Sequence, residues 1–585
     1  MMKSHVTLRS SKWLDDAELS GFVHRTAFRS SGFSRESFEG RPVIGICNSA
    51  SELVSCNLGF KDLAESVKRG VLQAGGIALE FPAMALGEQL MKPTAMLYRN
   101  LMSMDVEESI RAYPFDAVVL LGGCDKSVPA QLMGAASADV PTIVVTGGPA
   151  APAVFQGRQL GVGTDLWHYT DAFRAGTMSV QEFGELEAAA GPSIGHCPEM
   201  GTASTMATVV EGLGMTIPGG AAIPAYDSRR QQHAEACGRR AVEIAVECVR
   251  PSRILTQEAF DNAITLLLAV GGSTNAIIHL LALAGRVGVP LSLERFHELS
   301  QRTPVIVNVR PSGEYLVEQL FHAGGIPAVM AELAPLLHLD AMTITGKVVG
   351  DGLVTPSAPN RSIIATLDEP FVPVGGLAVV KGNLAPNGAV VKVSAASPDL
   401  LKHRGPAVVF EDMDDLIDRI DDPNLEVTAD SVLVLRMVGP KGGHGMPEWG
   451  HLPIPGKLLR TGVVDMVRVS DARMSGTSFG TTVLHVSPEA ADGGTLGLVE
   501  SGDYISLDAR AGVLHLEVDE AELARRRAVL DTAPRRPRFT RGYQSLHDQH
   551  VLQAHEGCDF DFLRGRSKNP DQEPVGMLTG WIGGW

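Results

Sequence analysis

Three cysteines in loop-like stretches are the first residues of this sequence that could carry chemistry. Cys56 lies in SELVSCNLG, Cys124 in LGGCDKSVP and Cys197 in PSIGHCPEMGTAST, each with glycine or proline nearby. The stretches are far apart and contain no close CxxC pair, so their spacing disfavours a zinc finger or a ferredoxin-type cluster. Plain burial, a nucleophilic thiol and a metal cluster held by three separate loops all remain open.

Oxygen donors occur in similar glycine-containing stretches. Glu88 follows a glycine in FPAMALGEQLMKP, Asp125 and Lys126 follow Cys124 directly, and Glu448 lies in GPKGGHGMPEWGH. Carboxylate oxygens of this kind are ligands that suit Mg²⁺. Taken one at a time, each carboxylate is more simply explained as a solvated or helix-capping side chain.

Two stretches rich in glycine and hydroxyl groups, MGTASTM (200–206) and VGGSTNAIIHL (270–280), are predicted to be loops that open helices. Free backbone N–H groups there could hold a substrate carboxylate, although N-capping by Ser204, Ser273 or Thr274 explains much of the pattern. Ser475 lies between methionine and glycine in SDARMSGTSFGT. A lone serine in such a turn is usually structural.

These side chains must be positioned by the elements that precede them. The runs RPVIGIC (41–47), DAVVLL (116–121) and PTIVVTGG (141–148) predict buried parallel strands, and FKDLAESVKRGVLQAG (60–75) and DNAITLLLAVGG (261–272) have helical spacing. This alternation predicts a layered α/β domain with a parallel sheet. Ligands collect at the carboxyl ends of parallel strands, so we expect the site at the glycines that end DAVVLLGG and PTIVVTGG.

From about residue 341 the sequence changes to short strands punctuated by glycine, such as MTITGKVV, SVLVLRMVG and DYISLDARAGVLHLEV. This pattern of short strands separated by glycines predicts a second, mostly β domain that is barrel-like. We expect an α/β domain over residues 1–360 with most candidate ligands, and a β-barrel-like domain over 361–585 with Ser475. A polar arm from about residue 540 is expected to pack on the body or on a second subunit.

Composition and charge exclude several classes of partner. The chain has 50 basic and 67 acidic residues, a net charge of -17, and its acidic residues are scattered. Nucleic acid and anionic membranes are therefore poor candidate partners. No stretch approaches the roughly 18 unbroken apolar residues of a membrane span, and MMKSHVTLRSSKW lacks the apolar core of a signal peptide. We therefore expect a cytoplasmic protein, and the seven widely spaced cysteines argue against a disulfide framework.

The sequence between about residues 10 and 510 closely resembles the family that contains dihydroxyacid dehydratase, phosphogluconate dehydratase and the aldonic-acid dehydratases. The resemblance rests on ordered motifs: GGCDKSVPA, GHCPEMGTASTM, IPAYDSRR, VGGSTNAIIHLLA, TITGK, GNLAPNGAVVK, GPKGGHGMPE, DARMSGTSFG and HVSPEA. FPAMALGEQLMKPTAMLYRNLMSMDVEE, Ala130 and the tail RGYQSLHDQHVLQAHEGCDFDFL are most similar to the sugar-acid branch, which includes enzymes for pentonates such as L-arabinonate and D-xylonate.

The resemblance implies two metal centres. A [2Fe-2S] cluster, or [4Fe-4S] in some relatives, would be held by the positions that match Cys56, Cys124 and Cys197. The ligands of a neighbouring Mg²⁺ would match Glu88, Asp125, carbamylated Lys126 and Glu448. A carbamate supplies an anionic oxygen that an ammonium group lacks. Ser475 matches the expected base, with Thr477 beside it, and the family implies a homodimer or homotetramer.

The sequence departs from the family pattern at three places without losing an implied ligand. Val54-Ser55 precede Cys56, Pro198-Glu199 follow Cys197, and His444 occupies a position often held by proline. These departures leave the identity of the substrate open.

The resemblance implies a hydro-lyase that dehydrates a 2,3-dihydroxy sugar acid, an aldonate, to the 2-keto-3-deoxy acid. Such a reaction removes a weakly acidic proton from C2 and expels hydroxide from C3, and each step needs electrostatic assistance. The alternative within the same chemistry is dihydroxyacid dehydratase of branched-chain amino-acid biosynthesis. A non-enzymatic iron-sulfur or zinc regulator is a further alternative, whereas a hydrolase with Cys124 as nucleophile lacks a credible histidine.

Overall fold

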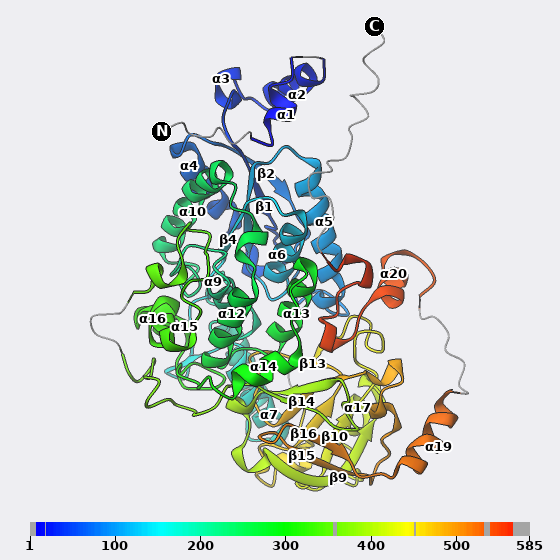
Figure 1. Cartoon of the computed structure of the whole chain (residues 1–585). Helices are drawn as coiled ribbons and strands as arrows, with labels where there is room; N and C mark the ends of the chain where they lie inside the picture. The colour runs from blue at the N-terminus through cyan, green and yellow to red at the C-terminus, as the bar shows by residue number, and fades with distance from the viewer. Residues whose placement is uncertain (1–7, 18, 355–359, 450–451, 532–538, 566–585) are drawn as a thin grey trace.

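The computed structural model describes residues 8–17, 19–354, 360–449, 452–531 and 539–565 (Figure 1). Its first sheet has four parallel strands in the order β2-β1-β3-β4. In chain order these are β1 Val43–Asn48, β2 Ile77–Pro82, β3 Ala117–Gly122 and β4 Thr142–Thr146. The central strands are apolar and buried on both faces, as the strands of a parallel sheet between helical layers must be.

Helices cover both faces of this sheet. In Figure 1, α4 (Phe60–Gln73) and α10 (Ser228–Glu247) lie on one side of the strands, and α5 (Arg99–Ala112) and α6 (Ser127–Ala138) lie on the other. The apolar spacing of FKDLAESVKRGVLQ places Phe60, Leu63, Val67 and Val71 in the core, which explains why α4 packs as a helix.

Three further helices are buried almost all round. They are α9 (Thr202–Gly212), α12 (Gln257–Ala269) and α13 (Asn275–Val287), and nearly every side chain in each is buried. A helix that is apolar on all sides is found inside a large domain. The other helices of this half are α1 Ser11–Leu14, α2 Leu19–Ser30, α3 Arg35–Phe38, α7 Thr164–Ala175, α8 Val180–Ala189, α11 Pro251–Ile254, α14 Leu293–Ser300, α15 Val317–His322 and α16 Gly325–Glu332, with a hairpin of β5 Ala153–Phe155 and β6 Arg158–Leu160.

The second sheet has eight strands in the order β16-β15-β9-β10-β12-β14-β8-β7. Their bounds in chain order are β7 Ala378–Val380, β8 Gly388–Val391, β9 Lys402–Phe410, β10 Val432–Leu435, β12 Arg468–Ser470, β14 Thr482–Ser487, β15 Tyr504–Asp508 and β16 Val513–Leu516. A bridge between Lys381 and Val513 joins the two ends, so the sheet is nearly closed. Helices α17 (Met413–Arg419), α18 (Gly456–Leu459) and α19 (Glu520–Asp531) accompany it.

The predicted fold class, a layered α/β half with a parallel sheet followed by a barrel-like β half, is confirmed. One feature differs from a barrel of simple hairpins, because the central neighbours β9, β10, β12 and β14 pair in parallel. The domain boundary at about residue 360 stays a prediction, and residues 355–359 next to it lie outside those described.

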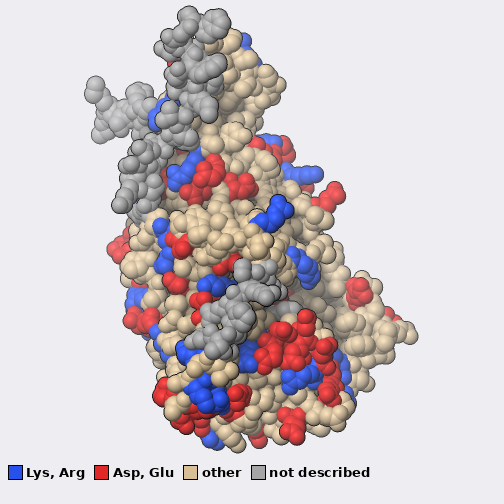
Figure 2. All heavy atoms as spheres, turned by 90° about the vertical axis from the view of Figure 1, so that its right-hand side faces the viewer, with Lys and Arg blue, Asp and Glu red and all other residues tan. Residues whose placement is uncertain are grey.

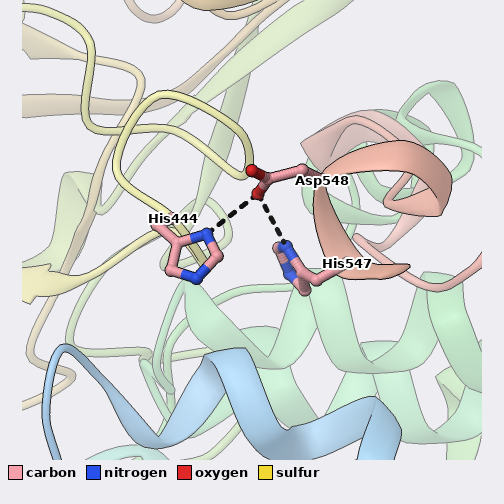
Figure 3. Close-up of side chains that lie close together, drawn as sticks. All are labelled: His444, His547 and Asp548. Carbon is pink, nitrogen blue, oxygen red and sulfur yellow. Dashed lines mark hydrogen bonds and ion pairs between the residues drawn. The ribbon is translucent and has the colours of Figure 1, made fainter. Parts of the chain in front are cut away.

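The arm after residue 540 packs on the body of the same chain. Its helix α20 (Gly542–His550) and the segment that follows lie against α5 and α13. The buried Arg286 guanidinium contacts the Asp559 carboxylate, with Nε–Oδ2 2.5 Å, and Arg99 donates to the carbonyl oxygens of Gly557 and Cys558. The arm also brings His547 and Asp548 against His444 (Figure 3).

Acidic and basic side chains are interspersed on the face that Figure 2 turns toward the viewer. Within the residues that the structure describes, no helix combines the length and the apolar character needed to span a bilayer.

Candidate functional site

The candidate ligands gather at the carboxyl ends of the parallel strands, as predicted. Cys56 follows β1 in the short 3₁₀ turn Ser55–Asn57, and Glu88 lies in the loop after β2. Cys124, Asp125 and Lys126 fill the turn between β3 and α6, so that a single strand end presents three reactive side chains. Cys197 comes from the loop before α9. The preceding residue, His196, forms an isolated β-bridge with Pro149, which follows β4.

The three loop thiols converge. A hydrogen bond with Cys124, together with burial and the negative charge of Cys124, Cys197 and Asp125, raises the pKa of the Cys56 thiol well above its ordinary value. Burial, followed by the charge of Glu199 and Asp125, does the same for the pKa of Cys197. All seven cysteines are free thiols. A set of three neighbouring thiols is chemically suited to a soft metal or an iron-sulfur cluster.

Close backbone packing brings two of these thiols together. A Cβ atom at Gly123 would lie 2.8 Å from the carbonyl oxygen of Cys56 and 2.6 Å from a side-chain oxygen of Asn57. Glycine is therefore required for the β3 turn to approach the Cys56 turn this closely. A cavity of about 300 Å³ opens beside Cys56 and is lined also by Gly147 and Gly195.

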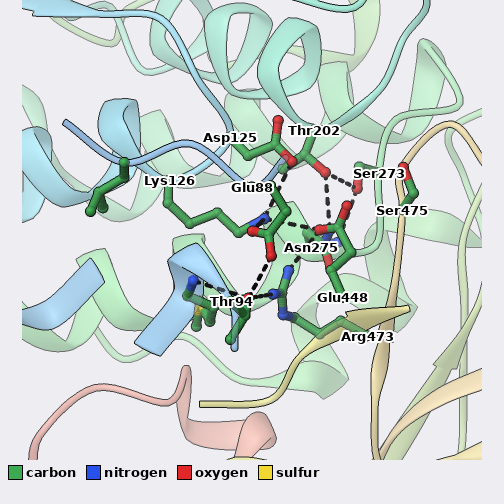
Figure 4. A network of polar contacts seen from close by, with 12 residues as sticks. Glu88, Thr94, Asp125, Lys126, Thr202, Ser273, Asn275, Glu448, Arg473 and Ser475 are labelled. Atoms are coloured by element: carbon green, nitrogen blue, oxygen red, sulfur yellow. Dashed lines mark hydrogen bonds and ion pairs between the residues drawn. The ribbon is translucent and has the colours of Figure 1, made fainter. Parts of the chain in front are cut away.

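The three predicted carboxylates surround the Lys126 ammonium group (Figure 4). Lys126 Nζ lies 3.1 Å from Glu88 Oε2, 3.2 Å from Asp125 Oδ2 and 2.9 Å from Glu448 Oε2. The lysine side chain is fully buried. Glu448 comes from the β half of the chain, where the short strand β11 (Glu448–Trp449) pairs in parallel with β13 (Arg473–Met474).

Arg473 is the second cation of this cluster. Its Nη1 donates to Glu448 Oε2 at 2.8 Å, and its Nη2 donates to Thr94 Oγ1 at 3.1 Å. The Thr94 hydroxyl in turn donates to Glu88 Oε1 at 2.6 Å. Asn275 Nδ2 donates to Glu448 Oε2 at 2.9 Å. The buried guanidinium of Arg473, in the β half of the chain, therefore contacts Thr94 in the loop after β2.

Charge interactions set the ionisation of the cluster. Burial and Arg473 disfavour the charged form of Lys126, but the carboxylates outweigh them and raise its pKa above its ordinary value. Burial opposes ionisation of Glu88, but Lys126 and Arg473 outweigh it and lower its pKa. For Glu448 burial and the neighbouring carboxylates prevail, so its pKa is raised. With all groups ionised, three carboxylates and two cations leave one net negative charge.

Ser475 follows β13 and faces Thr477. The two hydroxyl oxygens are 2.8 Å apart, and the Thr477 N–H donates to Ser475 Oγ at 3.3 Å. Trp167 Nε1 donates to Thr477 Oγ1 at 3.3 Å. An indole N–H is a donor only, so Thr477 Oγ1 accepts from Trp167, and either hydroxyl can be the donor in the Ser475–Thr477 bond. If Ser475 Oγ carries a negative charge it can only accept, and the Thr477 hydroxyl and N–H then both donate to it.

The two hydroxyl-rich stretches open helices α9 and α13, as predicted, and the structure places both helix starts beside the turn that carries Ser475. A Cβ atom at Gly476 would lie 2.6 Å from Ser273 Oγ and 2.7 Å from the Thr202 nitrogen, so only glycine fits between them. Of the three predicted capping residues, Ser273 does cap α13, because its Oγ accepts from the Asn275 N–H at 3.2 Å. The Thr274 side chain makes no capping bond, and Ser204 Oγ donates instead to the Glu199 carbonyl oxygen at 2.7 Å. Helix N-termini carry partial positive charge and favour anions.

Comparison with known proteins identifies the family. The description "Dihydroxy-acid/6-phosphogluconate dehydratase N-terminal" matches residues 41–352, and the C-terminal description of the same family matches residues 362–558. The chain belongs to this dehydratase family. It is accordingly a hydro-lyase, as the sequence motifs predict.

Three relatives of this dehydratase show where it stands in the family. It is 51% identical to an L-arabonate dehydratase of Azospirillum brasilense, covering 95% of this chain and 97% of the relative. It is 46% identical to a 6-deoxy-6-sulfo-D-gluconate dehydratase of Pseudomonas putida, covering 96% and 98%. It is 38% identical to a dihydroxy-acid dehydratase of Ruminiclostridium cellulolyticum, covering 92% and 97%.

Several residues that line the site of this dehydratase were not predicted from the sequence. They are Thr94, Asn275, Lys392 and Arg473. Asn275, Lys392 and Arg473 stand inside motifs that carry the family resemblance. Thr94 stands inside the stretch that is most similar to the sugar-acid branch, so the resemblance was the available signal for all four. Lys392 is buried, donates to the Gly476 carbonyl oxygen at 3.3 Å, and has its pKa lowered to about 7 by burial.

Proposed function

We propose that this chain dehydrates a 2,3-dihydroxy sugar acid, an aldonate, to the corresponding 2-keto-3-deoxy acid. The observation that carries the proposal is the meeting of three thiols and three carboxylates at Cys124, Asp125 and Lys126, next to Ser475. Soft sulfur donors and hard oxygen donors on adjacent residues suit two different metal centres. The sugar-acid dehydratases among the relatives are more similar to this chain than the dihydroxy-acid dehydratase is, which supports the aldonate.

The residues present fit both implied groups. We assign Cys56, Cys124 and Cys197 to a [2Fe-2S] cluster, with [4Fe-4S] as the alternative, and Glu88, Asp125, Lys126 and Glu448 to Mg²⁺. When bound, these groups supply Lewis-acid stabilisation of the negative charge that develops on the substrate and on the departing hydroxyl group.

The charge of the cluster supports carbamylation of Lys126. Carbamylation removes one positive charge and adds one negative charge, and Mg²⁺ brings two positive charges. The net charge of the buried cluster is therefore the same in the metal-free and the loaded protein. Glu448 Oε2 accepts from both Lys126 Nζ and Arg473 Nη1, and Arg473 Nη2 also donates to Thr94 Oγ1.

Ser475 is the proposed base. Its oxygen takes the C2 proton, the C3–O bond breaks, and the enol that results tautomerises to the keto acid. A serine hydroxyl is a weak acid, so its alkoxide needs donors and nearby positive charge. The Thr477 hydroxyl and N–H supply the donors, and the N-termini of α9 and α13 supply partial positive charge. The same N-termini favour the binding of an anionic substrate.

The test is keto-acid formation by protein purified without air, across a panel of aldonic acids and 2,3-dihydroxyisovalerate. We expect brown protein with about two irons per chain for a [2Fe-2S] cluster, and turnover of at least one aldonate above that of 2,3-dihydroxyisovalerate. Preferred turnover of 2,3-dihydroxyisovalerate would establish the branched-chain alternative. Full activity in colourless, iron-free protein would exclude the proposed chemistry. The same preparation, run on a sizing column, tests the homodimer or homotetramer that the family implies.

A further inference from the structure

A second group of metal-binding side chains lies outside the site described above. His444 comes from the glycine-rich loop that leads to Glu448, and His547 and Asp548 come from α20 in the arm (Figure 3). Their ligand atoms all lie within 4.8 Å of one another. The group therefore joins two segments that are about a hundred residues apart in the sequence.

The geometry of the group is only partly explained by hydrogen bonding. His444 Nδ1 lies 2.9 Å from Asp548 Oδ1, a normal hydrogen bond. His547 Nδ1 lies 3.8 Å from the same oxygen, which is too long for one. His547 Nδ1 is buried and has no hydrogen-bond partner within the part of the chain that the structure describes. A buried nitrogen lone pair or N–H left in this state is costly unless something else occupies the space.

The protonation states suit a cation. Burial lowers the pKa of His547, so its imidazole is neutral at pH 7 and has a lone pair to donate. Burial opposes ionisation of Asp548, but its polar contacts with the two imidazoles, of which the 2.9 Å contact with His444 is the shorter, hold its pKa below the ordinary value. The side chains of His444 and His547 are 4% and 3% exposed, whereas Asp548 is 19% exposed, so the group is sheltered but can be reached from solvent.

We propose that His444, His547 and Asp548 bind a divalent transition-metal ion such as Zn²⁺, with water in the remaining position. Two imidazole nitrogens and one carboxylate oxygen form a common ligand set for Zn²⁺ and its neighbours. Bonds of about 2.0–2.1 Å in a tetrahedral site place ligand atoms about 3.3 Å apart. The two separations to Asp548 Oδ1, 2.9 and 3.8 Å, lie on either side of that value, and the third, between the two imidazoles, is within 4.8 Å.

The position of the site suggests what the ion does. His444, Gly445 and Met446 all have positive φ, at 50°, 96° and 56°, and a positive φ is unfavourable for histidine and methionine. Met446 packs in a small core with Cys558 and Phe560 of the arm, and its carbonyl oxygen accepts from Arg473 Nε at 2.9 Å. An ion held by α20 and His444 would fasten the arm to this strained loop, which presents Glu448 to the active site.

The test uses the anaerobically purified holoprotein and Co²⁺ as the probe. We expect uptake of one equivalent of Co²⁺ beyond the metals already present, with a spectrum of nitrogen and oxygen ligands and no thiolate-to-cobalt charge-transfer bands. The absence of those bands separates this site from the three loop cysteines. The nearly isosteric variant D548N should lose the equivalent. The control variant H550Q, on the same helix, should retain it, because His550 pairs instead with Asp561 at 3.0 Å.

A second readout follows the arm. At a metal concentration of about 100 times Kd, binding should slow hydrogen exchange in α20 about 100-fold, because opening of the arm must first release the ion. D548N should show no such slowing. Absence of the extra equivalent, its retention in D548N, or thiolate bands in the cobalt spectrum would each overturn the proposal. None of these measurements depends on dehydratase activity, so failure here leaves the proposed function untouched.

Discussion

Replacing Lys126 by methionine should reveal how strongly the carboxylate cluster depends on its central ammonium group. Methionine nearly preserves the length of the side chain but removes the charge that lies within 3.2 Å of Glu88, Asp125 and Glu448. Lys126 is fully buried, so solvent screens these contacts little. Breaking a buried ion pair by removing one partner costs about 3–5 kcal/mol. We expect a loss of this size in the free energy of unfolding of the metal-free protein.

The matched control is K441M. Lys441 lies on the glycine-rich loop that leads to Glu448 and pairs with Asp492 at 2.7 Å, but both side chains are about one-third exposed. A pair of that kind contributes about 0–1 kcal/mol. Urea unfolding of the chelator-treated wild type, K126M and K441M measures the difference. Equal unfolding free energies for K126M and K441M would refute the assignment of a charged, buried Lys126.

The effect of K126M should depend on pH. In the wild type the pKa of Glu88 is lowered, so its contribution to stability is present above the unfolded pKa of about 4.3 and is lost as pH falls through the lower folded value. In K126M the carboxylates lack the ammonium, and protonation relieves their repulsion. The stability difference between the two proteins should therefore shrink as the solution is acidified.

Mg²⁺ distinguishes the two roles proposed for Lys126. The ammonium occupies the space between the three carboxylates, so Mg²⁺ should stabilise the wild type only when bicarbonate is present to carbamylate the lysine. K126M should be stabilised by Mg²⁺ without bicarbonate, because its three carboxylates no longer have a neighbouring ammonium charge that repels the ion. Wild-type stabilisation that is independent of bicarbonate would contradict carbamylation.

Two further predictions concern the Ser475 loop. S475A should lose about 10²–10⁴-fold in kcat while keeping its iron and its colour, as expected for removal of a proton-transfer group; undiminished turnover would exclude Ser475 as the base. K392M should be more stable than the wild type at pH 7, because the wild type must bury an amine whose pKa falls to about 7. Between pH 7 and the unfolded pKa of about 10.4 the unfolded chain holds a proton that the folded chain has lost, so wild-type stability should rise with pH by up to about 1.4 kcal/mol per unit. K392M should lack this slope in urea unfolding at pH 7, 8 and 9, whereas K381M, which changes a lysine that is 42% exposed, should keep it.

The strands of the first sheet differ in how well local sequence reveals them. The strands β1, β3 and β4 are continuous apolar runs because both faces are buried, and all three were predicted within two residues. The edge strand β2 was not predicted. Of its sequence IALEFP only Ile77 and Phe81 are buried, so it has neither a continuous apolar run nor a clean alternation.

The pairing of strands in the second half cannot be predicted from local sequence patterns. The turns in this part of the sequence predict strands, but parallel pairs such as β9 with β10 and β10 with β12 depend on crossover connections. The same limit applies to the site. Arg473 bonds to Thr94 across 379 residues of sequence, and no spacing rule predicts a contact that arises only when the two halves of the chain come together.

The turn Cys124-Asp125-Lys126 now has a physical account. Its first residue faces the other thiols and its last residue faces the carboxylates, while Asp125 influences both. Its charge adds to the hydrogen bond with Cys124 and to burial in raising the pKa of Cys56, and to burial and Glu199 in raising the pKa of Cys197, and its Oδ2 lies 3.2 Å from Lys126 Nζ. A cation bound to Asp125 offsets the negative charge that opposes thiolate formation. Binding of a cation by the carboxylate cluster therefore favours the ionised form of the loop thiols. By linkage the reverse holds as well, because thiolates formed at Cys56 and Cys197 strengthen the attraction of the carboxylate cluster for a cation.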